Sequence, residues 1–328
     1  MTVTETQAPS RANLNAPERN AQEAAWWDSL ELIGEDAGYY EPLGGRHGAF
    51  FSDEGPTLLV SFETAADIRA SAPDQLPAAF GVAKANGWSS LTIVSDGETW
   101  YRDRAVYAYF DRLVDDAFFE DFERVVFYGA GHGGYAAAAF SVTAPGATVI
   151  AIQPQATLDP RIAGWDTRFV DHRRTSFSDR YGYAPDMMEG AGEGFVIFDP
   201  AQTLDAMHAA LFTRPFVTKL PCPNLGQRIE VFLNEMGILT PMLEAACKGE
   251  FTAATFWKLY RARRNTPRYL RRLTTVLDDE ERPLLAALLC RNAARRLNGP
   301  RFRARLTQLE DELAARRITL PPLRAMNP

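Results

Sequence analysis

The sequence predicts a doubly wound α/β fold with a mostly parallel sheet, followed by an all-helical C-terminal extension. Two observations carry this prediction. Short runs of β-branched and aromatic residues alternate with helical patterns up to about residue 223, which is typical of parallel strands covered on both faces. From residue 224 onward the strand-like runs stop and only helical patterns continue.

The elements are expected in the following order. A helix over 21–38 comes first, and the strands that follow are 47–52, 56–62, 90–95, 124–129, 148–153, 194–199 and 216–220. Helical patterns such as GGYAAAAFSVTA and QTLDAMHAALF lie between strands. In such a sheet, a ligand site belongs at the carboxyl ends of the strands.

A chain of 328 residues is long enough for about two domains of roughly 150 residues. We expect a flexible tail over 1–20, a sheet domain over 21–223, an Arg-rich helical extension over 224–317 and a C-terminal tail over 318–328. The composition is 46% hydrophobic and 23% charged, which excludes a mostly disordered chain.

Several classes of protein are not expected. No apolar run is long enough for a membrane-spanning helix, and the first 25 residues lack the apolar core of a secretion signal. The three cysteines, Cys222, Cys247 and Cys290, lie far apart, which fits a reducing cytoplasm and disfavours disulfides or a cysteine-ligated metal. The sequence also lacks HxxxH and GxxxxGK[ST] motifs, so we expect no metal and no cofactor.

Charge is distributed unevenly along the chain. Residues 1–213 hold 14 Lys+Arg and 31 Asp+Glu, a net charge of −17, whereas 214–328 hold 21 and 11, a net charge of +10. The basic helices either pack on the acidic domain, face solvent, or bind an anionic partner. An anion-binding adaptor therefore stays open as an alternative, although no nucleic-acid-binding motif is present and nucleic acid is not expected.

The most informative segment is VVFYGAGHGGY over 125–135. An apolar strand runs into glycines and then directly into an Ala-rich helix. This resembles the nucleophile elbow of the α/β-hydrolase superfamily, in which Gly-x-Ser-x-Gly turns sharply from strand to helix. The order of strands and helices over about 45–240 is also similar to that family. The resemblance implies a crevice formed around Gly129, Ala130, Gly131 and Gly133.

The match departs from the family at its apex. Alignment of Gly129 and Gly133 with the flanking glycines places Gly131 where the nucleophilic serine is expected, and glycine has no nucleophile. In this register His132 follows the apex, where a backbone N–H helps to form the oxyanion hole. A shift of one residue would instead place His132 at the apex, but the first register fits the end of the strand better.

The other members of the catalytic triad are expected in the order acid, then histidine. Asp199 stands at the end of the strand 194–199 and matches the acid position. The four histidines are His47, His132, His172 and His208, so none follows the last strand where the family's base belongs. His208 lies in the helix after Asp199, where we interpret it as a packing residue.

Other polar residues are placed at the same edge of the sheet. Asp96 follows the strand 90–95 and is expected to line the crevice. The segment after strand 148–153 is polar and could cap the crevice, with Arg173 and Arg174 as a weak anion-binding pair. The glycines of GAGHGG alone are a weak dinucleotide signal, because Gln153-Pro154-Gln155 replaces the expected acidic residue.

The sequence therefore favours a catalytically degenerate α/β-hydrolase-like protein that binds a small molecule or a protein in its crevice. An atypical hydrolase or transferase that uses His132 and Asp199 remains the alternative. A sulfonucleotide reductase-like enzyme is a more distant one, because its Ser-Gly-Gly-x-Asp-Ser loop and Glu-Cys-Gly motif are absent. A second copy of the chain is a further partner left open.

Overall fold

The computed structural model describes residues 19–71 and 74–322, and these form two compact units. The first unit comprises the chain up to Ile197 together with Leu204–Leu220. The second comprises Phe198–Thr203 and the chain from Pro221 onward. Of the two expected tails, residues 1–18 and 323–328 lie outside the described residues.

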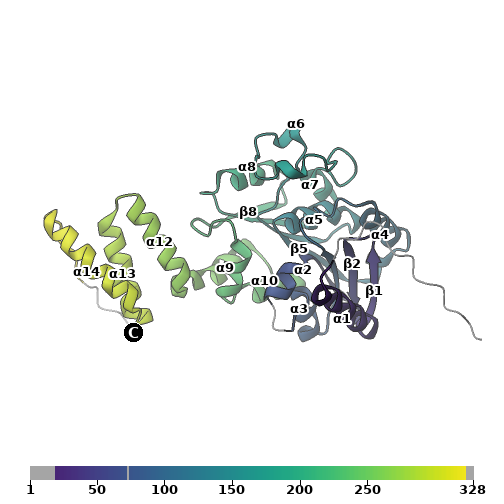
Figure 1. Cartoon of the computed structure of the whole chain (residues 1–328), viewed down its shortest axis with the longest axis horizontal. Coiled ribbons are helices and arrows are strands. Elements are labelled where there is room, and N and C mark those ends of the chain that lie inside the picture. The colour runs from purple at the N-terminus through teal and green to yellow at the C-terminus, as the bar shows by residue number, and fades with distance from the viewer. Residues whose placement is uncertain (1–18, 72–73, 323–328) are drawn as a thin grey trace, which may run out of the picture. The chain divides into compact units, whose positions relative to one another are not determined.

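The first unit contains an eight-stranded sheet with the strand order β1-β2-β4-β3-β5-β6-β7-β8 (Figure 1). Strand β2 is antiparallel to both β1 and β4, and the pairs from β4 through β3, β5 and β6 to β7 are parallel. This confirms the mostly parallel sheet. The strands are β1 (Gly38–Leu43), β2 (His47–Ser52), β3 (Thr57–Thr64), β4 (Ser89–Ser95), β5 (Arg124–Ala130), β6 (Thr148–Ile152), β7 (Glu193–Phe198) and β8 (Val217–Pro221).

Strand β1 was not expected from the sequence. It contains Glu41 and Pro42, both unfavourable in a strand interior. The strand lies at the edge of the sheet and pairs only with β2, so a proline without an N–H is tolerated there.

Helices of the first unit flank this sheet. They are α1 (Ala21–Ala37), α2 (Ala65–Ser71), α3 (Ala78–Asn86), α4 (Arg104–Asp115), α5 (His132–Phe140), α6 (Pro160–Ala163), α7 (Ala184–Met187) and α8 (Thr203–Leu211), with 3₁₀ turns η1 (Phe118–Asp121), η2 (Ser141–Thr143), η3 (Val170–His172) and η4 (Met188–Gly190). Helix α1 begins with a capping box, in which Asn20 accepts from the backbone N–H of Glu23 and the Glu23 side chain accepts in return. Within the described ranges, no helix is long and apolar enough to cross a membrane.

Side chains on the two faces of the sheet form separate aromatic layers. Adjacent strand residues point to opposite faces. Accordingly, Phe50 packs edge-on against Phe80 of α3, while Phe51 packs against Phe118 of η1. In the centre, Phe62 of β3 stacks with Phe110 of α4, Phe140 of α5 and Phe127 of β5. Both faces of the sheet are therefore covered by apolar side chains, as the continuous apolar strands predicted.

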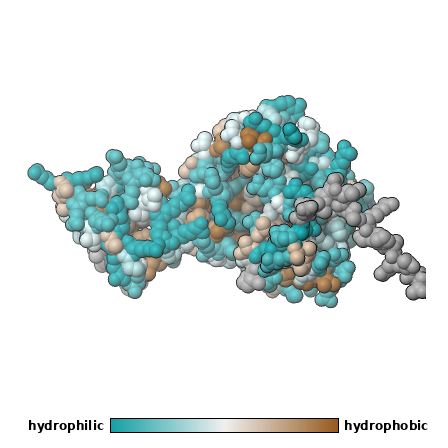
Figure 2. Space-filling model, viewed as in Figure 1, coloured by the Kyte–Doolittle hydropathy of each residue, from teal (hydrophilic) through white to brown (hydrophobic). Residues whose placement is uncertain are grey.

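The second unit is helical after β8. Its elements are α9 (Ile229–Glu235), α10 (Leu239–Cys247), α11 (Ala253–Leu259), η5 (Tyr260–Asn265), α12 (Pro267–Asp279), α13 (Pro283–Leu297) and α14 (Pro300–Ala315). A proline at the first position starts each of α12, α13 and α14, where its missing N–H has no intrahelical partner to lose. Hydrophilic residues cover most of the visible face of these three helices (Figure 2).

Residues 155–190, between β6 and β7, are named here the cap segment. Arg102 holds it in place, although this arginine comes from the loop after β4. The Arg102 side chain is only 1% exposed, and it pairs with Asp179. Its guanidinium also donates to the carbonyl oxygens of Ser176 (2.9 Å) and Arg180 (2.8 Å). One buried cation therefore fixes the backbone over 176–180.

Replacement of this cation should loosen the cap segment selectively. We expect Arg102→Ala to lower the free energy of unfolding by about 2–4 kcal/mol, because carbonyl groups and Asp179 lose their donor. Hydrogen exchange over 173–182 should accelerate. Arg180→Ala is the matched control, since it removes a half-exposed ion pair with Asp111 and cation–π contacts with the Tyr107 and Tyr181 rings, and should cost about 1 kcal/mol. Equal losses in the two variants would show that Arg102 does not hold the segment.

Candidate functional site

The turn between β5 and α5 is built by close contact of backbones. A Cβ atom on Gly129 would lie 2.1 Å from the Gly133 oxygen, and one on Gly133 would lie 2.3 Å from the Phe62 oxygen. A Cβ on Gly134 would lie 2.8 Å from the Ile152 oxygen. Helix α5 therefore starts directly against the ends of β3, β5 and β6, which only glycine permits at these positions.

Gly131 is different from these three glycines. It lies between the last residue of β5 and the first of α5, with φ +57° and ψ −124°. A Cβ atom built on it meets nothing within 4 Å. A side chain at this position would thus project into open space, at the point where the α/β-hydrolase resemblance expects the nucleophile.

Strained backbone occurs at this edge of the sheet. Trp100 and Tyr101, in the loop after β4, have φ values of +58° and +53°, and Gln153 after β6 has +48°. Bulky side chains rarely adopt this conformation, and two consecutive aromatic residues that do so are unusual. Strain of this kind gathers at ligand and active sites, so it marks the carboxyl ends of β4, β5 and β6 as a candidate site.

Buried polar atoms without partners occur at the same edge. Trp100 Nε1, His132 Nε2 and Gln155 Oε1 make no hydrogen bond to any of the residues that the structure describes. His47 lies at the same edge of the sheet, because β2 is antiparallel to β4 and places His47 opposite Ser95. Its Nε2 lies 2.7 Å from Thr99 Oγ1, whereas its Nδ1 lies 3.9 Å from the Asp103 carboxylate. Most buried polar atoms are paired, so this concentration makes the edge the candidate site of the first unit.

Aromatic rings surround these atoms. Trp100 lies 4.9 Å from Phe169 and 5.9 Å from His132, measured between ring centroids. Tyr101 stacks on His132 at 5.6 Å. Phe169 and Phe177, both in the cap segment, pack edge-on against Trp100. The loop after β4, the start of α5 and the cap segment thus meet at Trp100.

Burial keeps two of the histidines neutral near pH 7. It lowers the pKa of His132 to about 4, although the carboxylates of Glu98 and Asp67 act in the opposite direction. Burial likewise lowers the pKa of His47 to about 4 against the opposing charge of Asp103. An imidazole with so low a pKa is a weak general base at neutral pH, because proton transfer is most effective when the pKa lies near the working pH.

Asp96 lies at the same edge but is engaged by neighbours. Its carboxylate pairs with Arg19 Nε at 2.8 Å, and its carbonyl accepts from Arg46. Residues 19 and 20, expected in the tail, therefore contribute to the first unit. The expectation that Asp96 lines the crevice stays a prediction.

Asp199 belongs to the second unit and is fully buried. Its carboxylate accepts from three backbone N–H groups, those of Ala201 (2.9 Å), Asn224 (3.2 Å) and Gly226 (2.6 Å). These bonds tie the end of β7 to the loop after β8. A catalytic pairing of Asp199 with His132 stays a prediction.

Arg173 and Arg174 lie in the cap segment directly after η3, and both are exposed. Their side chains have no hydrogen bond or ion pair with the described residues. The anion-binding role expected for them stays a prediction.

A buried polar network beside the site escaped the sequence analysis. His208 is fully buried, its Nδ1 accepts from the N–H of Ala156 (3.1 Å), and its Nε2 lies 3.0 Å from Asp166. Arg168 then bridges Asp166 and Asp205. Although burial raises the pKa of Asp166, hydrogen bonds from His208 and Arg168 more than offset this and hold it below its usual range. Both ring nitrogens of His208 are thus occupied in anchoring the cap segment.

The strand order and the turn from β5 to α5 define a fold of the α/β-hydrolase type, with glycine at the apex of the elbow. Among the described residues, no group of three or more His, Cys, Asp or Glu side chains is placed to hold a metal ion.

No protein-family model and no curated protein matches the sequence. Among solved structures, the chain is similar to an esterase of Pyrobaculum calidifontis, with 16% identity over 71% of this chain and 91% of that one, at a TM-score of 0.38. It is also similar to a carboxyl esterase of Tuber melanosporum, with 12% identity over 64% and 82% of the two chains, at 0.37. It is similar, too, to the capsule O-acetyltransferase of Neisseria meningitidis serogroup A, with 10% identity over 60% of this chain and 91% of that one, at a TM-score of 0.39. At these values the fold assignment depends on the chain's own strand order and elbow.

The contrast among the glycines can be tested by alanine substitution. We expect Gly129→Ala to cost more than about 4 kcal/mol in the free energy of unfolding, because its Cβ would collide with backbone. Gly131→Ala should cost only about 1–3 kcal/mol, since it meets open space and adds only the strain of a positive φ. Urea unfolding measures both. A larger loss in Gly131→Ala would contradict this account of the elbow.

The neutral histidines predict a loss of stability in acid. Between the ordinary pKa of 6.5 and the folded value of about 4, the unfolded chain binds a proton at His132 that the folded chain does not. The free energy of unfolding should therefore fall as the pH is lowered through this window, by about 1–3 kcal/mol from His132 alone. Urea unfolding from pH 7.5 to 4 should show a shallower dependence for His132→Gln. An unchanged slope in a variant with a native circular dichroism spectrum would refute the prediction.

Proposed function

We propose that the chain is a catalytically degenerate protein of the α/β-hydrolase type that binds a small ligand at the carboxyl edge of its sheet. The observation that carries the proposal is Gly131, which presents no nucleophile where its backbone and the open space above it would suit one. The sequence also has no histidine after residue 208 to serve as the family's base. Removal of either group closes most of the covalent pathway.

The groups at the site favour an uncharged ligand. Trp100 Nε1 is a donor, Gln155 Oε1 an acceptor, and His132 is neutral near pH 7. The carboxylates of Glu98 and Asp67 interact electrostatically with His132. Their negative charge disfavours an anionic ligand at this site. The aromatic rings around Trp100 suit a flat apolar surface. A neutral aromatic compound with one amide or ester group meets all of these requirements.

An atypical hydrolase or transferase that uses His132 is the competing function. The unpartnered Nε2 of His132, beside the elbow, favours it. The low pKa of this imidazole makes it a poor base, and this favours binding instead. A protein partner and a second copy of the chain are alternative occupants of the crevice. The cytoplasmic location expected from the sequence stays a proposal as well.

Hydrolysis of a short-chain aryl ester separates the two functions. We expect wild type, His132→Ala and Gly131→Ser all to match the uncatalysed rate, because even a restored serine would lack its base. Release of p-nitrophenol from p-nitrophenyl acetate measures this. Hydrolysis by wild type that disappears in a folded His132→Ala variant would establish the enzyme instead.

Ligand binding needs its own measurement. Acetanilide is a suitable neutral probe and benzoate its anionic counterpart, and saturation-transfer NMR detects weak binding of either. We expect acetanilide to bind wild type more tightly than benzoate does, and Trp100→Phe to weaken it about fivefold through loss of one hydrogen bond. Trp257→Phe, on an exposed tryptophan of α11, is the matched control. Equal binding of the two probes, or no effect of Trp100→Phe, would overturn the proposal.

A further inference from the structure

The second unit contains a groove of about 530 Å³ between η5, α12 and α13. This volume is within the range of small-ligand sites. The residues that line the groove are Arg263, Arg264, Tyr269, Leu270, Leu273, Leu289, Asn292 and Arg296. Three of them are arginines and none is acidic, so the groove is positively charged.

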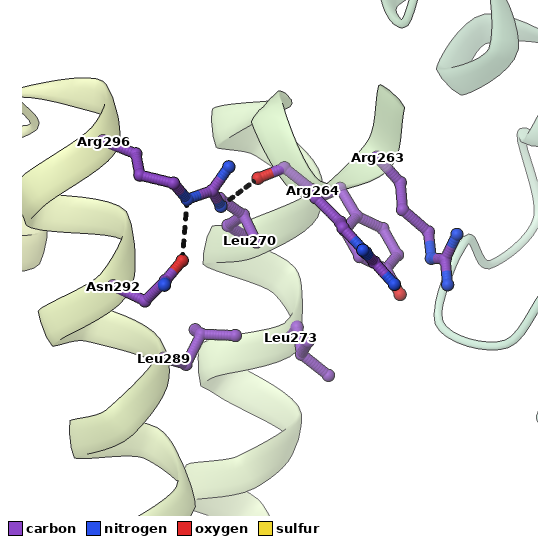
Figure 3. Close-up of a pocket in the computed structure, with 8 residues that line it drawn as sticks. Arg263, Arg264, Leu270, Leu273, Leu289, Asn292 and Arg296 are labelled. Atoms are coloured by element: carbon purple, nitrogen blue, oxygen red, sulfur yellow. Dashed lines mark hydrogen bonds between the residues drawn. The ribbon is translucent and has the colours of Figure 1, made fainter. Parts of the chain in front are cut away.

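Arg296, from α13, is held in a fixed orientation. Its Nε donates to Asn292 Oδ1 at 2.8 Å and its Nη2 donates to the Arg264 carbonyl oxygen at 2.6 Å (Figure 3). Its Nη1 also donates to Asn265 Oδ1. All of these acceptors are uncharged, so the positive charge of Arg296 is not neutralised by them. A guanidinium has further N–H groups that can bind a ligand.

Arg263 is oriented in a similar way. Its guanidinium lies 4.4 Å from the centre of the Tyr260 ring, and its Nη1 donates to the Tyr260 carbonyl oxygen at 2.9 Å. Arg264 is exposed, and its side chain forms no hydrogen bond or ion pair with the residues that the structure describes. The groove thus combines two pre-oriented cations with one that is free to move onto a ligand.

Apolar side chains form the other part of the lining. Leu270 and Leu273 come from α12 and Leu289 from α13, and Figure 3 shows Leu273 and Leu289 on the same side of Arg296. Leu273 and Leu289 are partly exposed, so a ligand that covered them would gain hydrophobic stabilisation. Cations beside an apolar surface suit a molecule with an anionic end and an apolar body.

We propose that this groove binds an amphiphilic organic anion, in which a carboxylate meets the arginines and an alkyl chain covers Leu273 and Leu289. This site is separate from the one at Trp100, whose neutral groups favour an uncharged ligand. The two sites therefore select ligands of different charge.

Isothermal titration of the full chain with octanoate tests the proposal. Octanol has the same chain without the charge, and acetate has the charge without the chain. We expect octanoate to bind at least about tenfold more tightly than either, because both parts of the groove are needed. Binding of acetate as tight as that of octanoate would reduce the groove to a diffuse basic surface and overturn the proposal.

Two substitutions locate the ligand. Arg264→Ala should weaken octanoate about fivefold to tenfold, whereas Arg261→Ala, an exposed arginine of η5 outside the groove, should leave it unchanged. Leu273→Asn should weaken the binding of octanoate although it leaves the net charge of the chain unchanged. Equal losses in Arg264→Ala and Arg261→Ala, in variants with wild-type thermal stability, would refute the location.

Two further measurements distinguish this proposal from binding at the Trp100 site and from binding to a membrane surface. His132→Gln should leave octanoate affinity unchanged, and a loss there would place the ligand at the other site. Vesicles with anionic phospholipid test a membrane surface as the source of the anion. Binding to vesicles without binding of free octanoate would overturn the proposal of a small-molecule site.

Discussion

The contact of helix α5 with three strands is the constraint on which the rest of the site depends. Gly129, Gly133 and Gly134 allow the first turn of the helix to touch the backbones of β3, β5 and β6 directly. This contact fixes where α5 begins, and it therefore fixes His132 as the first helical residue. It also directs Tyr135, in the next turn, to donate to the carbonyl of Tyr181 in the cap segment.

The strained backbone after β4 lies in contact with the cap segment. Trp100 and Tyr101 have positive φ values, and Phe169 and Phe177 of the cap segment pack against Trp100. Such strain persists only where surrounding contacts determine the conformation. Arg102, directly after the strained pair, supplies those contacts through Ser176, Asp179 and Arg180. The aromatic rings around Trp100 are thus held in place by contacts that a buried cation makes with the cap segment.

Sequence patterns predicted the parts of the fold that depend on local composition. Strands β2 to β7 were found because interior strands buried on both faces are continuously apolar, whereas β8 was found although it is an edge strand with one buried residue. Strand β1 was missed because an edge strand tolerates Glu41 and Pro42. The glycine spacing predicted the elbow, but nothing local indicated that His47 and Gln155 lie at the same edge. That depends on the antiparallel direction of β2 and on the path of the chain after β6, which are tertiary features.

The position of Asp199 shows why a family resemblance does not transfer a catalytic role. A carboxylate raises the basicity of a histidine when its charge is available to the imidazolium. The oxygens of Asp199 already accept from three backbone N–H groups, which join the end of β7 to the loop after β8. The carboxylate at this position thus has a structural role in the loop whether or not a triad exists. Its presence at the end of β7 therefore does not by itself assign a catalytic triad.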